Sequence, residues 1–508
     1  MGNGKVWLVG AGPGDVGLLT IKGMKVIEEA DVVVYDRLVG MGILSLIPDK
    51  ARCIDVGKTS GNHMMSQEGI NKLLLEEAKN GNRVVRLKGG DPFLFGRGGE
   101  EIELLVKEGI PYEIVPGITS AISVPAYNGI PVTHRDFTSS VHIITGHKKK
   151  DEEYDIDFSA LVKTKGTLVF LMGLSELGSI CKGLSDAGMD KNMPVAVLER
   201  GTTAKQRKVI SDLSTIEETV RLNNISTPAI IVVGKVCSLS KGFSWYEKLP
   251  LAGCRIAVTR PKELISGLSE KLRIKGAEVI ELPAIRIEPI KENLALKQSI
   301  SNLASYQWIV FTSPSGVNIF FEEMKSMKAD IRSLAGLKIA VIGEGTLKMI
   351  EGRGLYADLV PSRYDAENLG KELGAICFEG DRMLIPRADI GNILLVEEIK
   401  KRKNVVIDDI PTYRTVYEGS RIINEKEEFQ NRNIDYALFT SASTVRGFVS
   451  VTEGLDYGLV NAVCIGAQTK KEADGHGMKT QMAEKATLDS LVRLVEELHE
   501  KQRQGNEK

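Results

Sequence analysis

The 508-residue chain lacks the features that mark membrane, secreted and metal-binding proteins. No apolar run approaches the ~20 residues that a membrane-spanning helix needs. The residues after Met1 enter a strand-like run without the apolar core of a signal peptide. The six cysteines include no Cys-x-x-Cys pair, and the six histidines are equally scattered. These absences predict a cytoplasmic protein with reduced thiols and no metal site.

The charge balance also excludes some partners. The 66 basic and 67 acidic side chains leave a net charge of −1, so no long-range field attracts nucleic acid or an anionic membrane. Hydrophobic residues make up 43% and charged residues 26%, which is typical of globular proteins. The length predicts about three domains of ordinary size. We therefore expect small-molecule partners, with no nucleic acid and no membrane.

What the chain has instead is glycine, concentrated in one short segment. The segment 86–100 contains five glycines, namely Gly89, Gly90, Gly96, Gly98 and Gly99. It follows a strand-like run at 84–87 and precedes a helix-like run at 100–107. Glycine costs conformational order, so this density indicates that the backbone approaches a ligand closely. In a parallel α/β sheet such a turn lies at the carboxyl edge, where ligands bind. A flexible surface loop remains the alternative.

Strand-like runs alternate with helical spacing through the first half of the chain. The runs lie at 6–9, 30–36, 83–87, 141–145, 167–172, 194–198 and 229–234. The first three predict a parallel sheet with crossover helices, and the last four predict a second α/β lobe. We place these lobes at about 4–115 and 116–240. Residues 241–252 carry glycine and proline without a clear period and are predicted to be a linker.

The second half contains a duplication. Four ordered landmarks recur at offsets of 123 to 128 residues: 255–260 resembles 382–387, 282–286 resembles 410–414, 311–317 resembles 439–445, and 341–346 resembles 464–469. This period is too long for a solenoid repeat. It predicts two similar α/β lobes of domain size, and two such lobes leave a cleft between them.

Several single motifs are ambiguous by themselves. The loop 10–15 reads Gly-x-Gly-x-Gly, so it fails the dinucleotide fingerprint at the third glycine, and Pro13 removes an amide. Asp36 ends a strand and faces either a ligand crevice or a surface ion pair with Arg37. Lys58 is either a crevice group or a solvated loop lysine. Met172 follows a strand, where core packing is the simple alternative.

Taken together, these motifs make residues 4–240 resemble uroporphyrinogen III C-methyltransferase, of the tetrapyrrole methylase family. The stretches that carry the resemblance are 8–15, 35–39, 86–100, 115–121, 125–135 and 201–203. The departures are mild, with Val16 where proline is common and Asn128 where alanine is common.

The resemblance implies S-adenosylmethionine as cofactor, with S-adenosylhomocysteine as product, held between two lobes. Its contacts carry over to Pro13, Gly89, Gly90, Asp91, Leu94, Thr119, Ser120, Met172 and Gly201. Asp36 matches the proposed proton acceptor and Lys58 the proposed donor. Because members of the family are typically dimeric, a homodimer through this half is expected.

Residues 253–495 resemble uroporphyrinogen III synthase, and we expect this domain to extend over 253–500. The resemblance rests on shorter motifs, at 257–261, 311–313, 342–343, 413–415, 439–441 and 465–466. The family fold has two flavodoxin-like lobes joined by a β-ladder. It implies one lobe from about 253–285 plus 416–500 and another from 290–411. Tyr413 matches the tyrosine most often proposed for catalysis.

The strand-to-helix turns of this half are candidate binding sites for the carboxylates of a tetrapyrrole. Their residues are Thr312, Ser313, Thr440 and Ser441, and helix capping needs the same residue types. Arg260 and Arg387, related by the repeat, are either carboxylate clamps or surface charges.

The two resemblances together predict that the chain cyclises hydroxymethylbilane with inversion of ring D and then methylates the product twice. The final product is precorrin-2, which leads to sirohaem and cobalamin. A methylase acting on later corrin intermediates is one alternative. A second half that only binds tetrapyrrole, or holds a dimer, is another.

Overall fold

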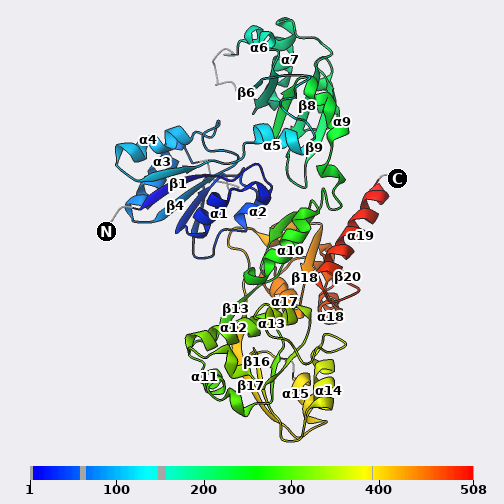
Figure 1. The fold of residues 1–508 in the computed structure, drawn as a ribbon. Coiled ribbons are helices and arrows are strands. Elements are labelled where there is room, and N and C mark those ends of the chain that lie inside the picture. Colours follow the sequence, from blue (N-terminus) through cyan, green and yellow to red (C-terminus); the bar gives the residue numbers. More distant parts are fainter. Residues whose placement is uncertain (1–3, 58–64, 147–155, 392, 507–508) are drawn as a thin grey trace.

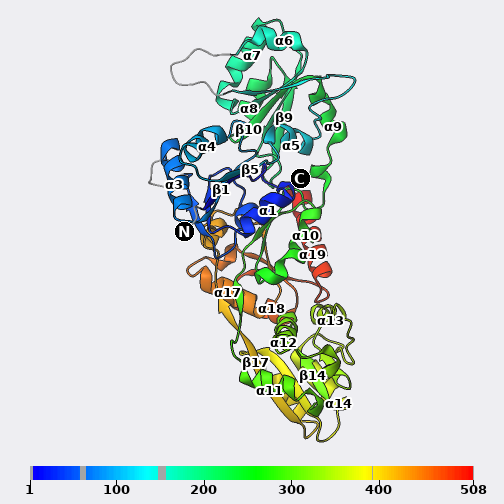
Figure 2. The ribbon, with the colours of Figure 1, turned by 60° about the vertical axis from the view of Figure 1, so that its left-hand side comes forward.

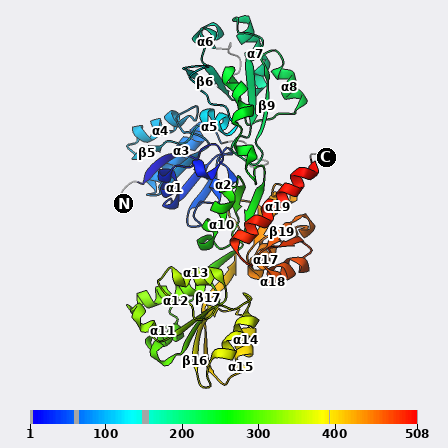
Figure 3. The ribbon, with the colours of Figure 1, turned by 45° about the vertical axis from the view of Figure 1, so that its right-hand side comes forward.

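Four five-stranded sheets form the frame of the molecule. The structure is a computed structural model that describes residues 4–57, 65–146, 156–391 and 393–506. The sheets follow one another along an elongated molecule, with the residues around α6 and α7 at one end and those around α14 and α15 at the other (Figure 1). The same order is visible in two rotated views (Figures 2 and 3). Within the described ranges, no helix combines the length and apolarity needed to cross a membrane.

The first sheet is parallel throughout, as the alternation of strand and helix signals predicted. Its order is β3-β2-β4-β1-β5, with bounds β1 Lys5–Gly10, β2 Val32–Tyr35, β3 Arg52–Asp55, β4 Arg83–Lys88 and β5 Tyr112–Val115. Four helices connect the strands, namely α1 Ile21–Glu28, α2 Met41–Leu44, α3 Gln67–Lys79 and α4 Gly98–Lys107. Val84 packs in one core cluster and Val85 in another, so both faces of β4 are covered. The carboxyl ends of β1, β2 and β4 therefore meet at one edge.

The second sheet is mixed. Its order is β6-β7-β10-β8-β9, and only β6 and β7 pair in parallel. The bounds are β6 Val141–Thr145, β7 Thr167–Leu171, β8 Pro194–Glu199, β9 Arg207–Asp212 and β10 Ala229–Val233. Strand β9 is absent from the sequence prediction because, at the sheet edge, only its Val209 is buried, which leaves no apolar run to detect. Helix α5, Ser120–Tyr127, joins this lobe to the first.

The duplicated landmarks occupy matching places in the third and fourth sheets. The third sheet has the order β12-β11-β18-β19-β20, and the fourth has the order β13-β17-β16-β14-β15. The third sheet contains β11 Arg255–Val258, β12 Glu278–Glu281, β18 Tyr436–Phe439, β19 Asn461–Cys464 and β20 Lys479–Met482. The fourth contains β13 Ile285–Pro289, β14 Trp308–Phe311, β15 Lys338–Val341, β16 Arg382–Ala388 and β17 Val406–Tyr417. The series β12-β11-β18-β19 thus matches β17-β16-β14-β15 strand for strand.

The two lobes of the second half are joined by a ladder. Strand β13 runs antiparallel to β17, from Ile285 opposite Tyr417 to Pro289 opposite Tyr413. Strand β17 also pairs with β16 inside the fourth sheet. The chain therefore leaves the first of these lobes along β13 and returns to it along β17; both strands are labelled in Figure 1.

The segment predicted as an irregular linker is instead packed. It forms the short helix α9, Ser240–Phe243, and a single helical turn at Tyr246–Lys248. The indole Nε1 of Trp245 donates a hydrogen bond to the Ala126 carbonyl oxygen at 3.0 Å. Tyr246 is buried, and its hydroxyl donates to the Gly276 carbonyl at 3.4 Å. The segment therefore attaches the second half to the first, a role that glycine and proline content does not reveal.

Candidate active sites

Three backbone segments meet at the carboxyl edge of the first sheet. Gly90 N donates a hydrogen bond to the Gly12 carbonyl at 2.7 Å, and Gly12 N donates back to Gly90 at 3.2 Å. A Cβ atom on Gly117 would lie 2.2 Å from the Gly90 oxygen, and one on Gly10 would lie 2.5 Å from Gly117 Cα. Because all these neighbours are backbone atoms, only glycine permits this approach. The flexible-loop alternative for the glycine segment is therefore wrong.

Asp91 holds this arrangement together. One carboxylate oxygen accepts hydrogen bonds from Phe93 N at 2.8 Å and Leu94 N at 3.1 Å, and the other accepts from Gly117 N at 3.0 Å. Gly90 has a φ of +68°, and a Cβ there would have Ser120 N, at 4.0 Å, as its nearest neighbour. The loop therefore presents bare backbone to open space beside the start of α5, which suits a cofactor that must approach the main chain closely.

Residues of the second lobe lie against the same sheet edge, where the sequence predicts the ligand crevice. The Oγ1 of Thr202 accepts a hydrogen bond from Asp15 N at 3.4 Å. A Cβ on Gly14 would lie 2.8 Å from the Thr203 side chain, and a Cβ on Gly201 would overlap Val124 at 2.3 Å. The loops after β1 and β8 thus lie against each other. This contact fixes the spacing of the two lobes.

Backbone strain concentrates in the same loops. Among the described residues, ten non-glycine residues have a positive φ. Five of them lie in the loops after β4, β7 and β8: Phe95, Arg97, Met172, Arg200 and Thr202. Such conformations cost about 1–3 kcal/mol each and cluster at ligand sites. Met172 is also 53% exposed, so the core-packing alternative for this residue does not hold.

All nine residues predicted to hold the cofactor lie in this region. Pro13 follows β1, Met172 follows β7 and Gly201 follows β8, while Gly89, Gly90, Asp91 and Leu94 follow β4. Thr119 is the N-cap of α5 and accepts a hydrogen bond from Ala121 N at 3.3 Å, and Ser120 opens that helix. Contact with a cofactor remains a prediction for each of them.

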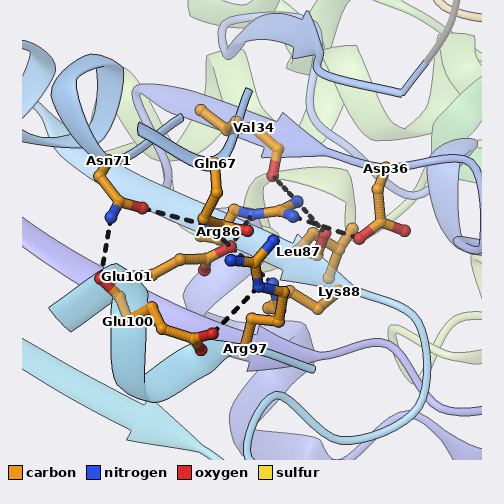
Figure 4. Close-up of polar contacts among 10 residues, drawn as sticks. All are labelled: Val34, Asp36, Gln67, Asn71, Arg86, Leu87, Lys88, Arg97, Glu100 and Glu101. Carbon is orange, nitrogen blue, oxygen red and sulfur yellow. Dashed lines mark hydrogen bonds and ion pairs between the residues drawn. The ribbon is translucent and has the colours of Figure 1, made fainter. Parts of the chain in front are cut away.

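Asp36 lies at the end of β2, and its partner differs from the one considered from sequence. One carboxylate oxygen accepts from Leu38 N at 3.1 Å, and the other forms an ion pair with Nη2 of Arg86 at 3.3 Å (Figure 4). The ion pair thus joins two strands rather than Asp36 and Arg37. Lys58, the other predicted catalytic residue of this half, lies outside the described residues.

Three charged residues behind Asp36 were missed by the sequence analysis. Arg86, Lys88 and Glu101 are 3%, 5% and 0% exposed. One Glu101 oxygen accepts from Lys88 Nζ at 2.6 Å and from Arg86 Nε at 3.2 Å. Burial and the neighbouring Arg86 lower the pKa of Lys88. The available signal was Arg86 and Lys88 in the otherwise apolar segment 84–88, because buried basic side chains need a charged partner.

In the second half, the structure brings two predicted residues together. The Tyr413 hydroxyl on β17 lies 2.8 Å from the Ser313 Oγ. Ser313 is the N-cap of helix α12, Pro314–Ser326, and accepts from Gly316 N at 3.0 Å. Tyr413 is buried, and burial raises the pKa of its phenol. The phenol is therefore protonated at neutral pH, as a proton donor must be.

The repeat-related turn has the same capping role. Ser441 is the N-cap of helix α17, Ala442–Val451, where it forms a capping box with Thr444. Thr312 and Thr440, one residue before each cap, follow the ends of β14 and β18 and are half-buried. Capping by both serines is thus confirmed. Carboxylate binding at these two turns remains a prediction.

The two repeat-related arginines differ in their surroundings. Arg387 is buried, and its Nε donates to Asp409 at 2.7 Å within a two-pronged ion pair. No ion pair or hydrogen bond involves Arg260 in the part of the chain that the structure describes, and its Nε is buried without a partner. Burial lowers the pKa of Arg260. A half-buried guanidinium that has no counter-charge among the described residues is suited to receive an anion, so Arg260 is the stronger clamp candidate.

The fold and these two sites define a class. The chain is an α/β protein of four sheets, with glycine-rich loops at the contact of the two lobes in its first half and a duplicated pair of lobes in its second. Residues 5–217 match the family described as Tetrapyrrole (Corrin/Porphyrin) Methylases. Residues 266–493 match the family described as Uroporphyrinogen-III synthase HemD.

Known proteins are similar to this chain over most of its length. It is 45% identical over 97% of its length to the Porphyrin biosynthesis protein HemD of Ruminiclostridium josui, 97% of which is covered. It is 42% identical to the Uroporphyrinogen-III C-methyltransferase of Bacillus subtilis (strain 168), over 73% of this chain and 78% of that protein. The solved native uroporphyrin III C-methyl transferase from Thermus thermophilus is 40% identical over 46% of this chain and 99% of its own, with a TM-score of 0.41.

The chain therefore belongs to the family of porphyrin-biosynthesis proteins in which a tetrapyrrole methylase is fused to uroporphyrinogen-III synthase. Both resemblances drawn from the sequence motifs are confirmed, and so is the α/β class. The cofactor prediction is confirmed as well, because tetrapyrrole methylases depend on S-adenosylmethionine. We refer below to residues 4–240 as the methylase half and to residues 253–500 as the synthase half.

Proposed function

We propose that the synthase half closes hydroxymethylbilane to uroporphyrinogen III and that the methylase half then methylates this product twice to precorrin-2. The observation that carries the proposal is the close backbone contact of the loops at Gly12, Gly90 and Gly117, at the same sheet edge as Asp36, in a chain that also carries the synthase lobes. The test is incubation of pure protein with hydroxymethylbilane and labelled S-adenosylmethionine. A product with two labelled methyl groups supports the proposal.

In the methylase half, the chain must bind the cofactor and remove a proton from the substrate. S-Adenosylmethionine supplies a methyl group on a positively charged sulfur. The loops after β1, β4, β7 and β8 would hold it, with bare backbone at Gly90 and the exposed side chain of Met172 toward the crevice. Asp36 accepts the proton from a pyrrole nitrogen, which raises the electron density of the ring carbon that is methylated.

In the synthase half, binding must fix a flexible molecule with eight carboxylates. The N-termini of α12 and α17 and the guanidinium of Arg260 are positive groups at the carboxyl ends of their strands. Tyr413 protonates the leaving hydroxyl, which departs as water. The rest of catalysis consists of holding the linear tetrapyrrole in position while ring D inverts and of excluding bulk water.

Replacing Tyr413 by phenylalanine is expected to slow ring closure only in part. The loss of the proton donor should cost less than about 100-fold, the lower end of the contribution of general acid catalysis, because positioning carries most of the rate. The rate of uroporphyrinogen III formation from hydroxymethylbilane, measured without S-adenosylmethionine, checks this. Complete loss of activity in a folded Tyr413→Phe protein would contradict it.

Replacing Arg260 by glutamine is expected to raise the KM for hydroxymethylbilane by roughly 10- to 100-fold, the equivalent of one charge-assisted hydrogen bond of about 1.5–3 kcal/mol. Thermal stability should not fall, because no carboxylate of the described residues loses a partner. Arg332→Gln, which removes a guanidinium whose side chain is 86% exposed, is the matched control. A lowered melting temperature with an unchanged KM would show a structural role instead.

A non-catalytic synthase half is the second candidate. The 2.8 Å contact between the buried Tyr413 and the half-buried Ser313 favours catalysis, because a purely structural module needs no such hydroxyl pair at this turn. The two cases separate when the isomer formed from hydroxymethylbilane is identified. An inverted ring D requires catalysis, whereas uncatalysed closure keeps the original order of side chains.

We also propose that the methylase half forms a homodimer and that the protein works in the cytoplasm. Both proposals rest on the family, and the cytoplasmic location also rests on the scattered spacing of the six cysteines. We also propose the domain limits 4–240 and 253–500, with lobe boundaries near 115, 285 and 416. These limits follow the division of the strands into four sheets. Light scattering of the purified protein and limited proteolysis test the dimer and the limits.

A further inference from the structure

A cluster of buried charges lies between β4 and α4, directly behind Asp36 (Figure 4). Glu101 is fully buried, and its Oε1 accepts hydrogen bonds from Lys88 Nζ at 2.6 Å, Arg86 Nε at 3.2 Å and Gln67 Nε2 at 3.2 Å. Removing charges from water is costly, and apolar side chains of similar volume usually stabilise a core at least as well. The cluster therefore points to a purpose other than stability.

The strand pattern explains why these charges are inside. Residues 84, 86 and 88 share one face of β4, since side chains alternate along a strand. Val84 on that face packs in a cluster with Leu105 of α4. Glu101, one helical turn before Leu105, points to the same face. The charged side chains of Arg86, Lys88 and Glu101 thus meet beneath the helix, toward the carboxyl end of the sheet.

Arg86 links the cluster to the crevice edge. Its Nε donates to Glu101, and its Nη1 donates to the carbonyl oxygens of Leu87 at 3.1 Å and Val34 at 3.5 Å. Its Nη2 is left to reach Asp36 at 3.3 Å. The guanidinium is planar, so fixing two of its nitrogens fixes the direction of the third.

We propose that Arg86 is a positioning residue for Asp36, and that Glu101 holds Arg86 in place. The proposal rests on the role given to Asp36 under the proposed function. With one oxygen bound by Leu38 N and the other by Arg86, the carboxylate has one orientation at the end of β2. A base held in that way meets the substrate proton without first reorganising.

Lys88 completes the charge balance of the cluster. The charged groups that act on it are Arg86 on its own strand, Glu101 on α4 and Asp36 after β2. Two cations therefore face two carboxylates. Removal of the Glu101 charge leaves Arg86 and Lys88 to repel each other, and the orientation of Arg86 is lost with that of Asp36.

The test compares Arg86→Met with Arg83→Met in the full-length protein. Arg83 lies on the same strand, and its ion-pair partner Glu29 is at the surface, so this variant controls for the loss of an arginine from β4. We expect Arg86→Met to lower the kcat of methyl transfer about 100-fold, the effect of misplacing a reacting group by about 1 Å. The Kd of S-adenosylhomocysteine should stay within about twofold of wild type. Arg86→Lys should recover part of the rate, since lysine supplies a charge without the rigid fork.

A double variant shows whether Arg86 acts through Asp36. In an Asp36→Asn protein, Arg86→Met should cause no further loss of single-turnover methyl transfer, because there is no carboxylate left to orient. Three results would each overturn the positioning role of Arg86. They are methyl-transfer rates for Arg86→Met equal to those of Arg83→Met, a parallel loss of S-adenosylhomocysteine binding, and additive losses in the double variant. Should Arg86→Met not fold, the isosteric Glu101→Gln decides by the same measurements. If Asp36→Asn alone transfers methyl groups at the wild-type rate, both the catalytic role of Asp36 and the positioning role of Arg86 are overturned.

Discussion

Asp36→Ala protein is expected to bind S-adenosylhomocysteine normally and to transfer methyl groups about 10²- to 10⁴-fold more slowly than the wild type. The carboxylate is the only group of the loop after β2 assigned to proton removal, and general bases contribute about 10²- to 10⁴-fold to rates. Its neighbours explain why cofactor binding should persist. The contacts of Asp36 are with Leu38 and Arg86, whereas the cofactor loops are held by Asp91. Labelled methyl incorporation and calorimetric titration measure the two properties separately.

Asp36→Asn is the more stringent form of this experiment. The amide keeps the size of the carboxylate, and its oxygen can still accept from Leu38 N, but it cannot take a proton. A slow Asn variant with a normal melting temperature assigns the effect to chemistry. Normal turnover in either variant would mean that another group accepts the proton.

The sequence predicted close backbone contact at this sheet edge because glycine carries a direct physical signal. A Cβ on Gly96, Gly98 or Gly10 would lie 2.5–2.6 Å from main-chain atoms, and Gly90 has a positive φ, so these positions favour glycine. Ser313 and Ser441 were predictable for the same reason, because a strand-to-helix turn needs a cap of that type. Close backbone contacts and helix caps each require particular residue types at particular positions. Those residues can be recognised in the sequence, so the sequence predicted these features.

The buried charges and the packed linker were not predictable, because their partners are distant in sequence. Nothing near Arg86 indicates that Glu101 will neutralise it, or that its fork will reach Asp36, fifty residues earlier. Trp245 and Tyr246 read as ordinary linker residues, yet they contact Ala126 and Gly276. Arg387 likewise carries the same repeat signal as Arg260, and only the fold shows that Asp409 already binds it.

Gly117→Ala is expected to lower the affinity for S-adenosylhomocysteine by at least about 100-fold and to lower the melting temperature. The new Cβ would lie 2.2 Å from the Gly90 oxygen and 2.6 Å from Gly10 Cα, so the backbone itself must move. Its movement breaks the hydrogen bond from Gly117 N to Asp91 and separates the loops after β1 and β4. Overlap with main-chain atoms cannot be relieved by a change of rotamer, which makes the expected effect large.

Gly99→Ala is the matched control for this variant. A Cβ at Gly99 meets nothing within 4 Å, and the residue lies inside α4, where alanine is favoured over glycine by about 0.8–1.0 kcal/mol. Its cofactor affinity should be unchanged and its melting temperature equal or higher. The synthase half is an internal control, because its sheets contain neither glycine and uroporphyrinogen III formation should continue in both variants. If Gly117→Ala bound S-adenosylhomocysteine as tightly as Gly99→Ala does, close backbone contact would not be what shapes the crevice, and the cofactor contacts assigned to Gly89, Gly90 and Asp91 would have to be sought elsewhere.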